Sequence, residues 1–256
     1  MADASLAPLL TEFLTAAVHL ILYSRRVYPA DAFEQRRLYD VRVYRWATPT
    51  ARRTRLQCTH LPASEPSCLA RRSRHPELTE YIDESIGGVR ELLERRELDA
   101  LVVLLIGPST AASAQPPGGT PCTQPELGVV ERFVFEMRPD AVPSRRAIQP
   151  SDEDAIRAQL RGFLNRILAS DSILAPRSPD THLSWSLELH GGGSGGNAFS
   201  EEMRNKWVEC DLNEEVGSIR GESVIAPIKS ISQPHLSMQL YVQEAADPNM
   251  GAESLR

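Results

Sequence analysis

The clearest strand pattern in this chain is the sequence LSMQLYVQ at residues 236–243. Apolar and polar residues alternate along it with a period of two, which predicts a β-strand with one face in a hydrophobic core. The run VIAPI at residues 224–228 predicts a shorter strand, whose proline belongs at a sheet edge or a bulge because proline has no N–H to donate. A glycine-rich run at residues 191–196 precedes both strands and predicts a flexible tether. We therefore expect the C-terminal segment to dock on the edge of a sheet and close over a bound molecule.

The remaining chain contains three helical patterns, three further strand patterns, and a loop entering a short strand at residues 33–43. Apolar residues recur at helical spacing in residues 6–22, 78–93 and 156–167. A continuous apolar run and two alternating runs, which predict strands, occupy residues 101–106, 131–137 and 183–189. Together these patterns predict an α+β fold in which three core helices pack on a mostly antiparallel sheet.

The patterns also predict how the domain is divided. We expect one domain at residues 6–245, with a core at 6–190, a closing segment at 191–245 and a tail at 246–256. Residues 45–74 and 107–127 have no periodicity and predict disordered insertions. Two arginine clusters in the first insertion fit a phosphate contact or a nuclear address as well as a plain solvated loop. In the second helix, the pair Gly87-Gly88 predicts the close approach of another backbone.

Composition and charge exclude several classes of protein. The 256 residues have a net charge of −6 at pH 7, which argues against a broad nucleic-acid grip, so we expect any contact with DNA to run through partners. The apolar run at residues 13–23 is too short to cross a bilayer, so we expect no membrane association. Cys58, His60, Cys68 and His75 match no common zinc spacing, and we expect no metal and no cofactor.

One motif supports an alternative function. Gly191, Gly193 and Gly196 satisfy the G-x-G-x-x-G spacing of a dinucleotide site, and Glu214 lies near the position of its acidic ribose contact. However, the preceding strand alternates with polar residues, whereas the first strand of such a domain is buried on both faces. The context therefore favours a tether and leaves a dinucleotide-dependent enzyme as a remote alternative.

Four blocks of sequence, in the same order, resemble one protein family. They are AVHLILY with VYP, HPEL with YI, FVFE, and MQLYV with a following glutamate, at residues 17–29, 75–82, 133–136 and 238–244. Phe33, Arg36, Tyr39 and Val41 add to the match between the first two blocks. The chain resembles the HORMA-domain accessory subunit of DNA polymerase zeta, the B type of mitotic-arrest-deficient-like protein, over nearly its whole length.

The resemblance implies an adaptor without catalytic activity. Its C-terminal segment would act as a safety belt over a short proline-containing peptide of the polymerase catalytic subunit, and a separate face would bind the C-terminal domain of a Y-family polymerase. It also implies roles in cell-cycle control and DNA damage tolerance, with a location in the nucleus and also the cytoplasm. A HORMA protein of the spindle checkpoint or the meiotic axis, which would capture other peptides with the same belt, is the alternative.

The resemblance also assigns roles to individual residues. Tyr81 and Trp207 match positions that pack against the captured peptide. Ile225, Gln239 and Tyr241 match the surface for the second polymerase, and Arg161 matches a position used in pairing of two HORMA domains. Glu209 stands where the family has a leucine, which is a departure beside Trp207. From periodicity alone, Gln239 and Tyr241 should lie on the sheet face opposite Leu240.

Overall fold

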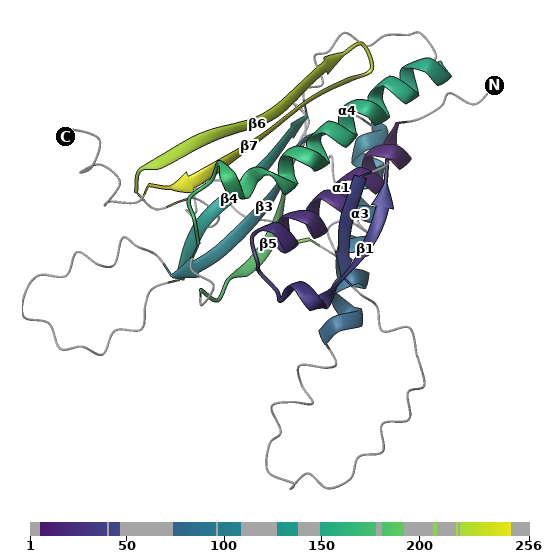
Figure 1. Ribbon diagram of the computed structural model, residues 1–256. Helices are drawn as coiled ribbons and strands as arrows, with labels where there is room; N and C mark the ends of the chain where they lie inside the picture. Colours follow the sequence, from purple (N-terminus) through teal and green to yellow (C-terminus); the bar gives the residue numbers. More distant parts are fainter. Residues whose placement is uncertain are drawn as a thin grey trace, which may run out of the picture.

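A five-stranded antiparallel sheet organises the structure, a computed structural model (Figure 1). Its strands are β5 (Ser184–Gly191), β3 (Leu98–Pro108), β4 (Leu127–Met137), β7 (Leu236–Ala245) and β6 (Ser223–Gln233), in that spatial order. The structure describes residues 6–39, 41–46, 74–95, 97–108, 127–137, 149–177, 181–191, 207–208, 219 and 221–246, with the backbone alone at 36, 41–46 and 74–77. The C-terminal hairpin β6–β7 is docked on β4 through β7, the strand that the alternation at residues 236–243 predicted.

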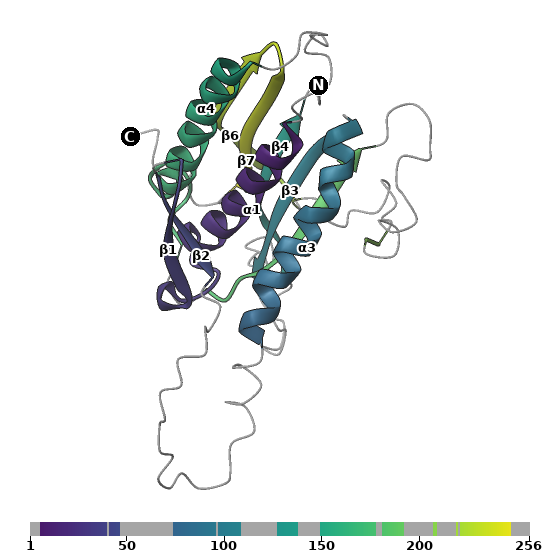
Figure 2. The ribbon, with the colours of Figure 1, turned by 90° about the vertical axis from the view of Figure 1, so that its right-hand side faces the viewer.

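Three helices cover one face of the sheet (Figures 1 and 2). They are α1 (Ala7–Ser24), α3 (Arg74–Arg95) and α4 (Pro150–Leu168), with the short turns η1 (Ala30–Ala32) and η3 (Ser170–Ser172) beside them. The central helix α1 packs between α3 and α4, which explains why so little of its sequence is polar. It is long and apolar enough to cross a membrane, but 67% of it is buried inside the fold, as in a core helix. The predicted α+β class with three core helices is confirmed.

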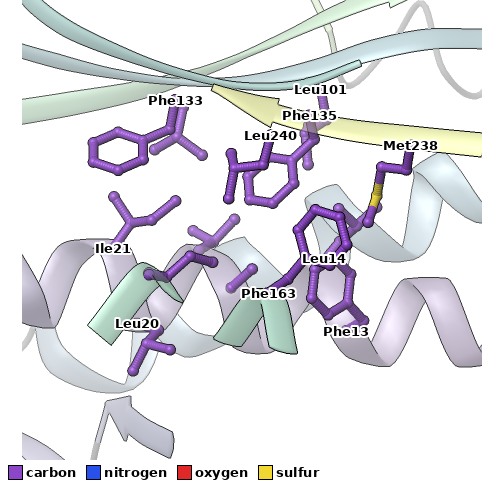
Figure 3. Packing of buried hydrophobic residues seen from close by; sticks show 14 of the residues in the cluster. Phe13, Leu14, Leu20, Ile21, Leu101, Phe133, Phe135, Phe163, Met238 and Leu240 are labelled. Carbon is purple, nitrogen blue, oxygen red and sulfur yellow. The ribbon is translucent and has the colours of Figure 1, made fainter. Parts of the chain in front are cut away.

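The hydrophobic core lies between these helices and the sheet (Figure 3). Phe13 of α1 contacts Phe135 of β4 and Phe163 of α4 edge-on, with ring centroids 6.1 and 5.9 Å apart. Met238 and Leu240 of β7 reach the same cluster and are almost completely buried. The C-terminal hairpin therefore contributes to the main core in addition to covering it.

A second, two-stranded sheet packs on the helices. Strands β1 (Phe33–Leu38) and β2 (Val41–Trp46) form a hairpin whose turn holds Tyr39 at a φ of 50°. The Tyr39 hydroxyl lies 3.2 Å from a carboxylate oxygen of Glu12, and burial followed by that charge raises the pKa of Tyr39. The hairpin is thereby fixed to α1.

The strands reach slightly into the segments predicted as insertions. β2 extends to Trp46, β3 extends to Pro108 and β4 begins at Leu127. The interiors of both predicted insertions, 47–73 and 109–126, lie outside the described residues.

Two glycines have opposite surroundings. A Cβ on Gly191 would lie 2.5 Å from the backbone oxygen of Glu97, so the end of β5 requires glycine. A Cβ on Gly87 would meet nothing within 4 Å, so the predicted close approach of another backbone is wrong for this position.

Alanine substitutions at these two glycines should therefore have opposite effects. Gly87→Ala is expected to raise the free energy of unfolding by about 0.5–1 kcal/mol, because alanine is the better helix former. Gly191→Ala is expected to lower it by about 1–3 kcal/mol through overpacking against a backbone atom. Urea unfolding of both variants measures the difference, and equal effects at the two sites would contradict the assigned environments.

Candidate functional site

The strand order leaves β5 at one edge of the sheet. Among the described residues β5 pairs only with β3, so half of its backbone N–H and C=O groups face outward. Such an edge is a template for one more strand from another chain. Trp185, Leu187 and Leu189 point to the helix side, because their partners Leu105, Val103 and Leu101 belong to the main core.

Three aromatic side chains, each in contact with the next, lie between this edge and α3. Tyr81 of α3 is 50% exposed and contacts Trp185 of β5 edge-on, with ring centroids 5.8 Å apart. The indole N–H of Trp185 donates a hydrogen bond of 3.0 Å to the Tyr28 hydroxyl. Tyr81 is thus an exposed aromatic side chain that could contact a bound peptide, and its ring packs on Trp185, which a hydrogen bond holds in place. Sequence reasoning placed Trp185 only in the core pattern of its strand; its position beside the free edge depends on the strand order.

The second predicted belt residue is Trp207. Trp207 is partly buried and packs against the main core cluster, while its neighbour Val208 is 89% exposed. No ring contact joins Trp207 to Tyr81 in the part of the chain that the structure describes. Glu209 lies outside the described residues.

The three residues predicted for the second polymerase share the face of the sheet opposite the helices. Tyr241 is paired with Val134 of β4 and with Pro227 of β6, and Gln239 is paired with Glu136. Ile225 is 59% exposed and lies on the same face, because its partner is Gln243. The predicted orientation of Gln239 and Tyr241, opposite Leu240, is confirmed by this register.

This outer face combines apolar and polar groups. Beneath its surface lies a small cluster of buried residues: Ala100, Val102, Leu104 and Val134. Tyr241 packs on that cluster, and burial, together with the charge of Glu136, raises the pKa of its hydroxyl against the opposing effect of Arg132. The face can therefore bury an apolar partner while its polar groups hydrogen-bond.

Arg161 lies on the exposed side of α4. It forms no ion pair within the described ranges, whereas Arg157, one turn earlier, is paired with Glu153 at 2.6 Å. Arg161 is therefore available for a contact with another molecule.

A buried ionic cluster joins α1 to the sheet. Arg25, at the end of α1, donates to Glu131 of β4 at 2.9 Å and to Asp171 at 2.6 Å. Arg177 donates to Glu131 at 2.6 Å from the other side, and the carbonyl oxygen of Ala175 accepts a further bond of 3.0 Å from Arg25. The Arg25 and Glu131 side chains have no exposed surface. All of these groups lie between residues 6 and 190, so the ionic cluster forms without a residue of the C-terminal hairpin.

The hairpin contacts this cluster at the end of β7. Glu244 is the register partner of Glu131, and its carboxylate accepts a hydrogen bond of 3.0 Å from the Ala175 N–H. Burial raises the pKa of Glu244 most; the Ala175 N–H lowers it, Glu131 raises it, and Arg25 and Arg177 lower it. An ionised Glu244 therefore opposes docking of its own strand.

We expect docking of β7 to depend on pH through Glu244. Because the docked state raises its pKa, the associated stability is fully present below pH 4.5 and is lost as pH rises through the raised pKa. Glu244→Gln removes this loss and should make amide exchange in β7 slower than in the wild type near neutral pH. Hydrogen exchange from about pH 4 to about pH 8 tests this. A difference between wild type and variant that does not change with pH would contradict it.

The other end of the hairpin docks on α4. Lys229 of β6 lies 5.5 Å from the ring centroid of Phe163, in a cation–π contact, and packs against Gly162. Near the hairpin turn, the Nε2 atom of His235 is 3.7 Å from a carboxylate oxygen of Asp152. The hairpin is thus held by α4 on one side and by β4 on the other.

The described residues show neither a metal site nor a dinucleotide site. No group of three metal-binding side chains occurs among the described residues, and the side chains of Cys58, His60, Cys68 and His75 lie outside them. The strand before the glycine run, β5, is an edge strand of the sheet that the described residues form, unlike the buried first strand of a dinucleotide-binding fold. Gly193, Gly196 and Glu214 lie outside the described residues.

Comparison with known protein families shows which class of protein has this fold. The HORMA-domain family matches residues 7–161, more than half of the chain. The protein therefore belongs to the HORMA-domain family.

Two named proteins are similar to this chain over most of its length. The rat "Mitotic spindle assembly checkpoint protein MAD2B" is 27% identical over 95% of this chain and 92% of its own length. The Arabidopsis thaliana "DNA polymerase zeta processivity subunit" is 23% identical over 91% of this chain and 83% of its own length. The resemblance to the accessory subunit of that polymerase, first seen in four sequence blocks, is confirmed.

Solved structures share the fold. A chain in the crystal structure of the mitotic checkpoint complex superimposes with a TM-score of 0.63 at 15% identity and covers 94% of this chain and 98% of that one. The C. elegans protein HTP-2, bound to the HIM-3 closure motif, superimposes with a TM-score of 0.56 at 8% identity and covers 94% of this chain and 90% of that one.

Proposed function

We propose that this protein is a non-catalytic adaptor that captures a short proline-containing segment of the catalytic subunit of DNA polymerase zeta. The same molecule would bind the C-terminal domain of a Y-family polymerase on another face and so act in DNA damage tolerance in the nucleus. The observation that carries the proposal is the β5 edge, which among the described residues pairs only with β3 and lies beside Tyr81, while the C-terminal hairpin occupies the edge of β4.

The β5 edge supplies what capture of an extended segment requires. Backbone groups of an edge strand bind an added strand in a way that does not depend on its sequence, and alternate side chains then give selectivity. Tyr81 and Trp185 provide an aromatic surface for a proline ring or an aliphatic side chain. A belt that crosses from the end of β5 to β6 would have to open before release, which lowers the off-rate.

Names of relatives support the proposed partner. A plant relative is named a processivity subunit of polymerase zeta, and a worm HORMA protein was solved with a closure motif bound. The alternative, a HORMA adaptor of the spindle checkpoint, is favoured by the name of the rat relative. Both functions use the same edge and belt, and they differ in the captured peptide.

The outer face and α4 carry the remaining proposed contacts. Ile225, Gln239 and Tyr241 would bind the second polymerase, because they share one face with an apolar cluster at its centre. This face is separate from the β5 edge, which allows one molecule to bridge two partners. Arg161 would take part in pairing with a second HORMA domain.

Peptide binding to the purified full chain tests the function. The double variant Tyr81→Ala/Trp207→Ala should lose a labelled proline-containing peptide of the polymerase catalytic subunit, while Tyr241→Ala retains the peptide and loses only the Y-family domain. Arg157→Ala, on the exposed side of α4, is the matched control and should retain both. Binding of a checkpoint peptide in place of the polymerase peptide would establish the alternative. Full retention by Tyr81→Ala/Trp207→Ala would remove both residues from the site.

A further inference from the structure

We propose that Lys229 of β6 is an acylation site, at which transfer of an acyl group to the side-chain amine releases the C-terminal hairpin from α4. The amine holds the docked hairpin against the helix as a cation, and an acyl group removes that charge and adds bulk. The effect on docking stands by itself, whereas its consequence for a captured segment rests on the proposed function.

A β-bulge turns Lys229 toward the helices. Pro227 is paired with Tyr241 on the outer face of the sheet. Lys229 is paired with Leu240, the residue next to Tyr241, so Ile228 is an extra residue in β6. Leu240 and Ile228 both belong to the main core, which places Lys229 on the helix side with them. In a regular ladder Lys229 would lie one position further along β7, on the outer face.

Helix α4 leaves a gap where Lys229 meets it. A Cβ atom on Gly162 would lie 2.9 Å from the Cε atom and 3.4 Å from the Nζ atom of Lys229, so the side chain fills the space that glycine leaves. The Nζ atom lies 5.5 Å from the centroid of the Phe163 ring, whose face attracts a cation. Glycine weakens the interior of a helix, and contact with Lys229 offsets that weakness only while the hairpin is docked.

Lysine is rare in this sequence, and both lysines lie in the segment at residues 191–245. Lys206 and Lys229 are the only lysines among the 28 lysine and arginine residues. Arginine stays protonated and accepts no acyl group under these conditions, whereas the lysine amine is the usual target of acetylation. Every acyl transfer to a lysine of this chain therefore falls on the closing segment. Lys206 lies outside the described residues, and Lys229 is the lysine that contacts α4.

Acylation would act on both contacts of Lys229. The neutral amine attacks the carbonyl carbon of an acyl thioester, such as acetyl-coenzyme A. A C–N bond forms, the C–S bond breaks, the thiol leaves and the nitrogen loses a proton, so that a neutral amide replaces the ammonium group. The amide has no charge for the Phe163 ring to attract. Its added atoms also enter a space in which a Cβ on Gly162 would already be too close.

Full-length protein in which Lys229 is replaced by Nε-acetyllysine during translation tests the inference. Amides of β6 and β7 should exchange about fivefold faster than in the wild type, while amides of β3 change less. The same replacement at Arg157, on the exposed side of α4, is the control and should leave exchange in β6 and β7 unchanged. Mass spectrometry of the protein from its own cells should find the acyl group on Lys229, and an unmodified Lys229 there would overturn the inference.

The gap in α4 gives a second, independent variant. Gly162→Ala should slow exchange within α4, because alanine is the better helix former, and should nevertheless speed exchange in β6. The double variant Gly162→Ala/Lys229→Ala removes the overlap and should exchange in β6 no faster than Lys229→Ala alone. Slower exchange in both α4 and β6 of Gly162→Ala would show that Lys229 does not depend on the gap and would overturn the inference.

The outcomes separate the inference from the proposed function. Unchanged exchange with Nε-acetyllysine at position 229, or equally faster exchange in all strands, overturns the inference and leaves the proposed function standing. Faster exchange confined to β6 and β7, together with faster dissociation of the captured peptide, supports both. The same exchange pattern with an unchanged dissociation rate supports acylation control of docking and contradicts retention of the segment by the belt.

Discussion

Replacing Arg25 with methionine is expected to lower the free energy of unfolding by about 3–5 kcal/mol. The substitution keeps most of the side-chain volume but removes the guanidinium that bonds Glu131, Asp171 and the Ala175 carbonyl. Glu131 is completely buried, and Arg177 alone would remain to compensate its charge. Urea unfolding followed by circular dichroism measures the loss.

An exposed arginine provides the matched control for this prediction. Arg157 forms an ion pair with Glu153 one turn away on α4, and both side chains are partly exposed to solvent. Arg157→Met should lower stability by less than about 1 kcal/mol, because water screens such pairs. A double variant Arg25→Met/Glu131→Leu should recover part of the loss, since no buried charge is left unpaired. A loss below about 1 kcal/mol for Arg25→Met would show that the cluster is not needed for stability.

The sequence predicted the main elements because their signals are local. The alternation at 236–243 and the continuous apolar run at 101–106 both lie within single strands, and each strand formed as predicted. The helical spacing at 6–22 likewise predicted a helix, which formed as α1. Family resemblance then supplied residues, such as Tyr81, that no local pattern distinguishes from an ordinary surface aromatic.

Contacts between distant segments were not predictable in this way. Arg25 and Glu131 are 106 residues apart, and Glu131 had been seen only as a polar position in an alternating strand. Trp185 and Tyr28 are 157 residues apart, and their hydrogen bond depends on the strand order. Pattern and propensity describe a strand but do not say which strand will lie beside it.

The C-terminal hairpin forms part of the hydrophobic core. The sequence predicted that the C-terminal segment docks on the edge of a sheet, and pairing of β7 with β4 agrees with that prediction. However, Met238, Leu240 and Val242 are buried in the main core together with Phe135 and Phe163. Opening of the hairpin would therefore expose core surface, so the docked state is stabilised by hydrophobic burial as well as by backbone hydrogen bonds.

Leu240 is a residue at which this stabilisation can be removed. Its side chain is fully buried and faces Phe135 across the β4–β7 pair (Figure 3). Leu240→Ala is expected to lower stability by about 2–5 kcal/mol, because it removes buried methyl groups and leaves a cavity. Since the lost contacts hold the hairpin to the core, we expect the destabilisation to favour release of β6 and β7.

Hydrogen exchange and binding together test this expectation. Amides of β6 and β7 should exchange faster in Leu240→Ala than in wild type, while amides of the central strand β3 change less. Gln239→Ala, at the neighbouring position on the outer face, should leave exchange in β6 and β7 unchanged and should weaken only the contact with the second polymerase. Because an open belt no longer retains its segment, Leu240→Ala should also increase the dissociation rate of the captured peptide. Uniformly faster exchange in all strands would mean that β6 and β7 open only with the whole fold, and the hairpin could then not act as a separate latch.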